Sequence, residues 1–113
     1  MTCPYCNNPA ELVGGERLYP HREDLHNRLF WFCAPCDAYI GARKDGGSMG
    51  SMANFETREA RIRARSAMES LGMRRNEAMR AILLEMRWPE VPISRMSAED
   101  CAEFILAVKR IKG

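Results

Sequence analysis

The second half of the chain repeats apolar residues at the spacing of amphipathic helices. Three helices are predicted, over residues 54–71, over residues 75–87 and from Ser97 onwards. Gly72 follows the first as a C-terminal cap, and Trp88-Pro89 ends the second because the residue before a proline avoids helical backbone. Ser97 and Asp100 form a capping-box signal for the third. The three apolar faces comprise Ala60, Ala64, Ala67, Met68 and Leu71; Met79, Ile82, Leu83 and Met86; and Cys101, Phe104, Ile105, Val108 and Ile111.

Residues 1–45 show short apolar runs that are typical of strands. Residues 11–13 and 16–19 flank Gly14-Gly15, which predicts a two-residue hairpin turn. The aromatic-rich run 29–32 and the run 38–41 predict two further strands, one on each side of a cysteine pair. The polar stretch 20–27 predicts a loop or a short helical turn.

The change from strands to helices predicts an α+β chain of two parts. We expect an N-terminal module over residues 1–45, a flexible connector rich in glycine, serine and methionine over 46–53, and a three-helix region over 54–113. A chain of 113 residues has room for one domain or two very small ones. It buries only about two-thirds of its unfolded surface, so a metal or disulfide staple would help it.

Four of the five cysteines stand in two Cys-x-x-Cys pairs, separated by 26 residues. Zinc prefers four soft ligands in a tetrahedron, and each Cys-x-x-Cys turn supplies two thiolates from one tight loop. Asn7 and Asp37, which follow the pairs, tolerate the left-handed backbone that tight turns often need. The sequence therefore predicts an N-terminal zinc ribbon, a module of short antiparallel strands around a structural Zn²⁺ ion. Its predicted ligands are Cys3, Cys6, Cys33 and Cys36.

A disulfide framework and a redox motif are the alternatives for these cysteines. The odd cysteine count and the absence of a visible secretion signal argue against disulfides. A thioredoxin-like motif needs one pair beside a βαβ pattern, which this sequence does not show. A closed shell of four thiolates leaves no open position, so the predicted zinc is structural and not catalytic. The fifth cysteine, Cys101, lies in a helical pattern and is predicted to be a small buried hydrophobe.

The net charge gives no argument for a nucleic-acid partner. The bare chain carries +2, and four zinc-bound thiolates together with the Zn²⁺ ion would cancel it. The basic excess is local, because residues 51–75 hold six arginines and three acidic residues. Arg58, Arg61 and Arg65 have i, i+3, i+7 spacing, share a helical face and suit bidentate contact with phosphate. The alternative is a solvated face on which Glu56 and Glu59 pair with the arginines.

The zinc module contributes further candidates for contact with a partner. Arg43 and Lys44 follow the last predicted strand, and Trp31 or Tyr39 would stack against a base if its ring were exposed. Most aromatic residues of this module are instead expected to pack over the metal site. The candidate nucleic-acid or partner-binding residues are therefore Arg58, Arg61, Arg65, Arg43, Lys44, Trp31 and Tyr39.

Two histidines, His21 and His26, lie in the polar loop between the cysteine pairs. This placement is loosely similar to zinc-stapled nucleases of the histidine–metal finger class. The match is poor, because no acidic residue directly precedes a histidine and Asp37 replaces the asparagine after the last cysteine. The alternative is that both histidines make loop hydrogen bonds or that one supports a thiolate. No nucleophile constellation or phosphate-binding glycine motif is present, so we favour a non-catalytic role.

The overall composition excludes a fully disordered chain, with 46% hydrophobic and 28% charged residues. No apolar run approaches the ~18 residues of a membrane-spanning helix. No basic segment followed by an apolar one stands at the N-terminus, so no signal peptide is visible. We therefore expect a cytoplasmic protein with no membrane contact.

Three segments carry a family resemblance, namely residues 1–6, 18–25 and 30–41. They resemble the small zinc-finger-containing proteins of phages and prophages, a family without an assigned biochemical activity. The similarity continues through residues 49–54, the arginine-rich helix and residues 75–78, and it covers most of the chain. The resemblance implies a zinc ribbon joined to helices and a phage context, hence the cytoplasm of a host cell. It does not supply a reaction.

Three functions follow as hypotheses. The first, which we favour, is a zinc-stapled binding module that contacts nucleic acid through the arginine-rich helix. The second is a phage protein that binds a host protein, for example a defence or transcription component, since eight methionines offer adaptable apolar surface. The third is the histidine–metal finger nuclease.

Overall fold

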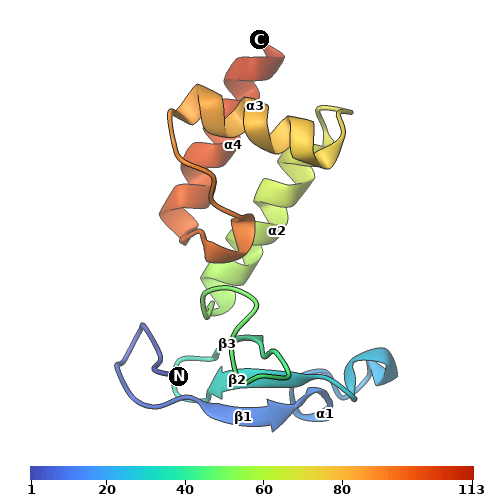
Figure 1. Cartoon of the computed structure of the whole chain (residues 1–113), viewed down its shortest axis with the longest axis vertical. Helices are drawn as coiled ribbons and strands as arrows, with labels where there is room; N and C mark the ends of the chain where they lie inside the picture. Colours follow the sequence, from blue (N-terminus) through green and yellow to red (C-terminus); the bar gives the residue numbers. More distant parts are fainter. The chain divides into compact units, whose positions relative to one another are not determined.

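The chain forms two compact units, Met1–Phe55 and Glu56–Gly113, in a computed structural model that describes all 113 residues (Figure 1). The first unit contains β1 (Glu11–Gly14), α1 (Gly15–Leu18), η1 (Glu23–Leu25), β2 (Leu29–Cys33) and β3 (Ala38–Gly41). Downstream lie α2 (Phe55–Glu69), α3 (Arg75–Met86), η2 (Ile93–Arg95) and α4 (Ala98–Lys112). The α+β class is confirmed, and α1 is a fourth, very short helix that the sequence did not predict. No helix has the length and apolar character that crossing a membrane requires.

The first unit is built on an antiparallel sheet with the strand order β1-β2-β3. In its register Leu12 faces Trp31, and Trp31 faces Ile40 on the next strand. Because facing residues of an antiparallel sheet share one side, the sheet has two distinct surfaces. One surface carries Trp31, Cys33, Ala38 and Ile40, and the other carries Val13, Phe30, Phe32 and Tyr39.

The second of these surfaces holds an aromatic cluster. The Tyr39 ring lies edge-on to those of Tyr19 and Phe30, with centroids 5.9 and 6.0 Å away. The hydroxyl oxygens of Tyr19 and Tyr39 are 2.7 Å apart. The Arg17 guanidinium of α1 lies 5.1 Å from the centroid of Phe32. Edge-to-face and cation–π contacts of this kind add stability beyond simple burial, so they hold α1 against the sheet.

The predicted hairpin at Gly14-Gly15 is wrong, because β1 pairs with β2 and Gly15 begins α1. Neither glycine has the positive φ that a two-residue hairpin turn requires, and Gly14 has φ −77°. Gly15 is needed for close approach instead, since a Cβ there would overlap the Leu25 carbonyl oxygen. The aromatic strand β2 offers β1 better cross-strand partners than the charged run 16–19 does.

Residues 46–53 were expected to form a flexible connector, but they belong to the first unit. Ala53 forms a bridge with Tyr39, and Ser48 forms one with Ala42. Met52 is 2% exposed and packs with Cys3, Cys33 and Ala38. The segment thus lies along β3 and supplies a core residue, so the division between the units falls at Phe55–Glu56.

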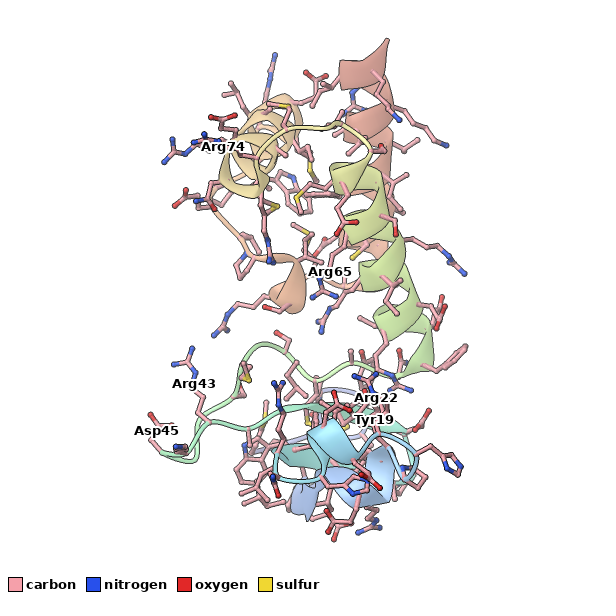
Figure 2. All side chains as sticks on the ribbon, turned by 90° about the vertical axis from the view of Figure 1, so that its right-hand side faces the viewer. Tyr19, Arg22, Arg43, Asp45, Arg65 and Arg74 are labelled. Atoms are coloured by element: carbon pink, nitrogen blue, oxygen red, sulfur yellow. The ribbon has the colours of Figure 1, made fainter.

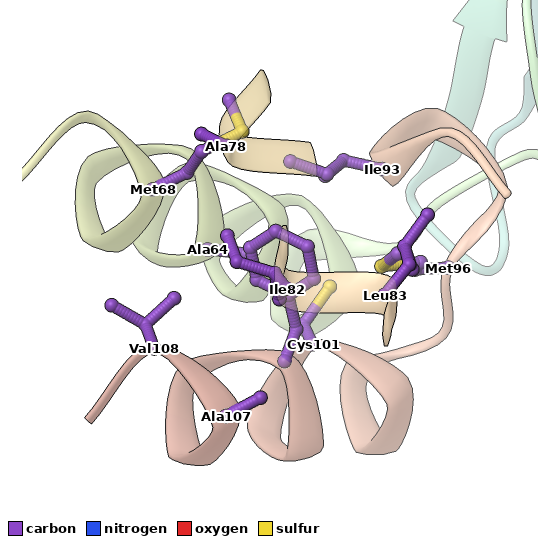
Figure 3. Packing of buried hydrophobic residues seen from close by; sticks show 11 residues of the cluster. Ala64, Met68, Ala78, Ile82, Leu83, Ile93, Met96, Cys101, Ala107 and Val108 are labelled. Carbon is purple, nitrogen blue, oxygen red and sulfur yellow. The ribbon is translucent and has the colours of Figure 1, made fainter. Parts of the chain in front are cut away.

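The second unit encloses its own hydrophobic core between α2, α3 and α4 (Figure 3). The three predicted apolar faces line it, with Phe104 fully buried at its centre. α3 ends where Arg87 adopts a left-handed backbone with φ 58° and donates its N–H to the Leu83 and Leu84 carbonyls. The buried members are Ala64, Met68, Ala78, Ile82, Leu83, Ile93, Met96, Cys101, Phe104, Ala107 and Val108.

Replacing Ser97 by alanine is expected to lower the free energy of unfolding of the second unit by about 1 kcal/mol. The Ser97 hydroxyl accepts the Asp100 N–H at 3.1 Å, and the Asp100 carboxylate accepts the Ser97 N–H at 3.1 Å. This confirms the capping box at the start of α4. Urea unfolding followed by circular dichroism measures the loss. The control Ser66→Ala, at an exposed position of α2, should change stability by under ~0.5 kcal/mol; equal losses would contradict the cap.

Candidate metal centre

Four sulfur atoms converge at one end of the sheet in the first unit. The Sγ atoms of Cys3, Cys6, Cys33 and Cys36 all lie within 4.8 Å of one another. The Sγ atoms of Cys6 and Cys33 are 3.6 Å apart, and no cysteine is in a disulfide. A tetrahedral zinc ion with Zn–S bonds of about 2.3 Å separates its sulfur ligands by about 3.8 Å. The donor set and its spacing therefore fit a structural Zn²⁺ ion.

Each cysteine pair stands in a tight turn that directs both thiols to the same point. The Asn7 N–H donates to the Cys3 carbonyl at 2.9 Å, and the Asp37 N–H donates to the Ala34 carbonyl at 3.1 Å. Asn7 has φ 61° and Asp37 has φ 49°, so the left-handed backbone predicted after both pairs is confirmed. Short polar side chains adopt this conformation more readily than other residues with a Cβ. The local sequence thus builds both halves of the site.

The cysteines are also the centre of a small hydrophobic cluster. Cys3 is fully buried, Cys33 is 5% exposed, and Cys6 and Cys36 are half-buried. Their apolar neighbours are few, namely the buried Ala38 and Met52 and the half-buried Ala10, Trp31 and Ile40. Such a cluster limits the access of water to the thiols but is small for a unit of 55 residues. Zinc–thiolate bonds would stabilise this unit in place of a larger core.

Without a metal, hydrogen bonds shift the pKa values of Cys6 and Cys36 in opposite directions. A hydrogen bond from the Asn8 backbone lowers the pKa of Cys6 to about 7. A hydrogen bond with Cys6 is the main reason that the pKa of Cys36 rises to about 12. A coordinated zinc ion reverses this effect, because a thiol bound to it loses its proton. Binding therefore releases protons, and zinc affinity falls as the pH falls.

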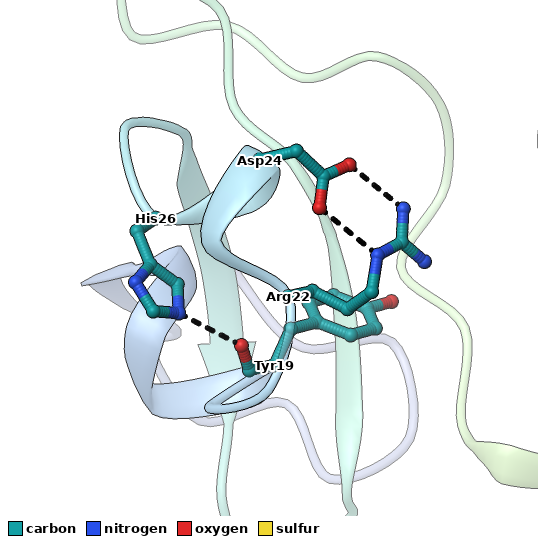
Figure 4. Close-up of polar contacts among 4 residues, drawn as sticks. All are labelled: Tyr19, Arg22, Asp24 and His26. Atoms are coloured by element: carbon teal, nitrogen blue, oxygen red, sulfur yellow. Dashed lines mark hydrogen bonds and ion pairs between the residues drawn. The ribbon is translucent and has the colours of Figure 1, made fainter.

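The histidine loop makes its contacts within itself. His26 Nε2 lies 3.0 Å from the Tyr19 carbonyl oxygen (Figure 4). Arg22 donates two hydrogen bonds to Asp24, at 3.0 and 2.8 Å (Figure 4). The cysteine cluster is the one group of three or more histidine, cysteine or acidic residues placed to share a metal. These contacts favour the interpretation in which His26 orders the loop, while His21 is exposed.

The candidate partner-binding residues of the first unit fall into two sets. Arg43 and Lys44 are exposed on the loop that follows β3, where Figure 2 labels Arg43. Trp31 packs against the zinc cluster, and its Nε1–H donates to the Gly47 carbonyl at 3.3 Å. Tyr39 belongs to the aromatic cluster on the opposite side of the sheet. Both rings are thus engaged within the unit, whereas the two cations face solvent.

The predicted arginine face of α2 is divided by burial. Arg61 is 5% exposed, and its Nε–H donates to the Met96 carbonyl at 2.9 Å. It precedes Ala64 by three residues and Met68 by seven, so it lies on the buried side of the helix. Because the sequence shows this spacing, the burial of Arg61 was predictable from it. Arg61 therefore ties α2 to the start of α4, while Arg58 and Arg65 stay half-exposed.

Removing zinc is expected to unfold the first unit and leave the second folded. The reason is that metal binding is folding energy for a unit with so small a core, whereas α2, α3 and α4 share a core of their own. Each unit holds one tryptophan, Trp31 or Trp88, so Trp88→Phe leaves fluorescence from the first unit alone. With a strong chelator, Trp31 emission should shift to the red while the helical circular dichroism signal largely persists.

Two cysteine substitutions provide matched variants for metal analysis. Cys33→Ser should lose the one equivalent of zinc, and Cys101→Ala should keep it. Cys101 is buried in the core of the second unit and is not among the four cysteines whose sulfur atoms converge, so it is not a predicted ligand. A Cys33→Ser chain that still binds zinc stoichiometrically would refute the ligand set.

Comparison with protein-family models matches residues 1–111 to a zinc-finger-containing domain, DUF3268. No curated protein and no solved structure matches the chain significantly. The matched range includes the cysteine cluster, α2, α3 and all of α4 but its last residue. The sequence spacing, the converging sulfur atoms and the family model agree on a zinc-binding module. The chain therefore belongs to this family of zinc-finger-containing domains.

Proposed function

We propose that this protein is a zinc-stapled, non-catalytic binding module that contacts nucleic acid through arginines of α2 and α3. The observation that carries the proposal is a set of arginines in the second unit that make no ion pair. Their guanidinium groups suit phosphate oxygens, which accept two parallel hydrogen bonds. Four of them lie on α2 or at the start of α3, namely Arg63, Arg65, Arg74 and Arg75.

Two of these arginines meet at the connection between α2 and α3. Arg65 and Arg75 line a hollow of about 140 Å³, together with Met68, Glu69 and Met73. Figure 2 shows Arg65 on α2 and Arg74 immediately before α3. Residues from two helices therefore converge on one surface, which a single helical face of the sequence did not predict.

Of the residues predicted by helical spacing, Arg65 belongs to this set, the half-exposed Arg58 stays a candidate outside it, and Arg61 is removed by its burial. Arg63, Arg74 and Arg75 join it because they are exposed. The alternative, a solvated face on which glutamates pair with the arginines, is not favoured for Arg63 and Arg65, since neither pairs with a glutamate.

The charge of the two units supports the same assignment. Residues 1–55 hold five basic and six acidic residues, and residues 56–113 hold twelve and nine. The bare units therefore carry −1 and +3, and four thiolates with one Zn²⁺ bring the first unit to −3. A polyanion is attracted to the second unit although the zinc-loaded chain as a whole is neutral.

Replacing Arg65 and Arg75 together by glutamine tests the proposal. Fluorescence anisotropy with duplex DNA, single-stranded DNA and RNA should show binding that weakens with salt. Each lost phosphate contact lowers the salt slope by about 0.9 on duplex DNA, so the double variant should lose about two units of slope.

The control for this variant is Lys109→Gln with Lys112→Gln, which removes the same charge from the exposed end of α4. It should leave the slope nearly unchanged. Equal losses in both variants, or no binding by the wild-type chain at low salt, would refute the arginine surface. Cleavage of the probe with Mg²⁺ or Mn²⁺, lost in His26→Ala, would support the nuclease instead.

A second candidate function is contact with a protein partner, such as a host protein in the phage context that the sequence resemblance implies. Leu84 and Leu106 are 79% and 52% exposed in the second unit. Leu106 lines a hollow of about 280 Å³ with Met86 and Trp88, side chains that are enriched in protein interfaces. A pull-down from host extract separates the two functions. A partner retained after nuclease treatment and lost in Leu84→Ser with Leu106→Ser would favour protein contact.

A further inference from the structure

We propose that the first unit carries a separate groove that takes one unpaired nucleotide. The groove lies where β2 begins and β3 ends and has a volume of about 360 Å³. This is within the range of about 300–1,000 Å³ that small-molecule sites occupy. Its lining includes three cations, Arg28, Arg43 and Lys44, and three apolar residues, Leu29, Phe30 and Met49. We call it the Arg43 groove.

The charge of the Arg43 groove is opposite to that of its unit. No carboxylate lines it, and its three cations are exposed and make no ion pair. Asp45 on the same loop accepts the Gly47 N–H at 2.9 Å. Asp24 accepts two hydrogen bonds from Arg22. These are the main reason that the pKa of Asp24 is lowered, and the charge of Arg28 contributes less. A lining with three positive charges and no negative one, in an acidic unit, indicates an anionic ligand such as a phosphate.

The floor of the groove is apolar and accessible. Met49 is 59% exposed and lies on the same side of the sheet as the half-buried Phe30, which faces Gly41. Met49 packs closely on the β3 backbone, because a Cβ at Gly41 would lie 3.0 Å from its sulfur. A planar base gains contact on such a surface, and the thioether is soft and adaptable. Cations beside an apolar floor match the phosphate and the base of a single nucleotide.

The loop that presents the cations is ordered by its own backbone. The Ala42 N–H donates to the Leu29 carbonyl, and the Met49 N–H donates to the Gly41 carbonyl, both at 2.9 Å. The Arg43 N–H donates to the Gly47 carbonyl at 2.9 Å, and Gly46 closes the turn with φ +89°. Figure 2 labels Arg43 and Asp45 on this loop. Little ordering is needed on binding, which favours affinity.

An unpaired nucleotide fits better than a duplex or an acidic peptide. In a duplex both faces of a base are covered by its neighbours, so the floor would stay empty. An acidic peptide satisfies the cations but has no planar group adjacent to each charge. The proposal shares its ligand class with the proposed function, but it rests on residues of the other unit. The two proposals therefore stand or fall separately.

Met49→Ser tests the floor without changing the charge. In the full zinc-loaded chain, this variant should bind a single-stranded oligonucleotide about tenfold more weakly, with an unchanged salt slope and unchanged duplex affinity. Arg43→Gln with Lys44→Gln should instead lower the single-strand salt slope by about 1.4. The matched control is Lys109→Gln with Lys112→Gln, which removes two exposed charges outside the groove and should change single-strand affinity less than about twofold.

A second readout reports directly on the base. With methionine methyl groups labelled by ¹³C, the Met49 resonance, assigned by its loss in Met49→Ser, should show a ring-current shift on adding the oligonucleotide. A mononucleotide that produces the same shift at micromolar concentration would identify a free nucleotide as the source. A shift that the oligonucleotide produces and the mononucleotide does not would identify a nucleic-acid strand as the source.

Specific outcomes would overturn the groove. They are equal single-strand binding by Met49→Ser and the wild type, no shift of the Met49 methyl, or a glutamate-rich peptide binding more tightly than the oligonucleotide. If Arg65→Gln with Arg75→Gln abolishes all binding while Met49→Ser binds like the wild type, the groove is refuted and the α2–α3 surface is kept. The reverse result would refute that surface and keep the groove.

Discussion

Convergence of four thiols at one point is the constraint on which the first unit depends. Both tight turns, with left-handed Asn7 and Asp37, direct sulfur atoms to the same place. Cys33 ends β2, and Cys36 lies two residues before β3, so the ladder between these strands is aligned by the second pair. Met52 closes the cluster from a segment sixteen residues further on. Few other buried side chains hold these parts together, which makes the metal the main source of their stability.

The two units reach stability by different means, although each has fewer than 60 residues. The second unit buries an apolar core between three amphipathic helices instead. It even accommodates a buried arginine, because the Met96 carbonyl and further contacts satisfy the guanidinium of Arg61. A zinc staple in the first unit and helix packing in the second leave the other charged residues outside both cores. Arginines of α2 and α3 and the cations beside β3 are therefore available for binding.

Much of the secondary structure was predictable because its signals are local. Helical spacing identified α2, α3 and α4, and Ser97 with Asp100 identified the start of the last one. The hairpin at Gly14-Gly15 failed because glycine pairs mark both turns and close approach, and only the position of the Leu25 carbonyl distinguishes them. Arg61 was misplaced for a related reason. Its position on the apolar stripe was visible, but its charge was given more weight than its spacing.

The predicted zinc ligands and the apolar faces of the helices can be read from local patterns in the sequence. Cysteine spacing, turn residues and helical periodicity act over a few residues, and their consequences hold wherever the chain lies. The tertiary structure decided which strand accepts β1, which arginine is buried, and which cations lie beside an apolar floor. Arg28 and Met49 meet in one groove, and Arg65 and Arg75 line one hollow, although neither pair is close in sequence. Contacts between such distant residues depend on how the elements pack, and a local sequence pattern carries no information about that packing.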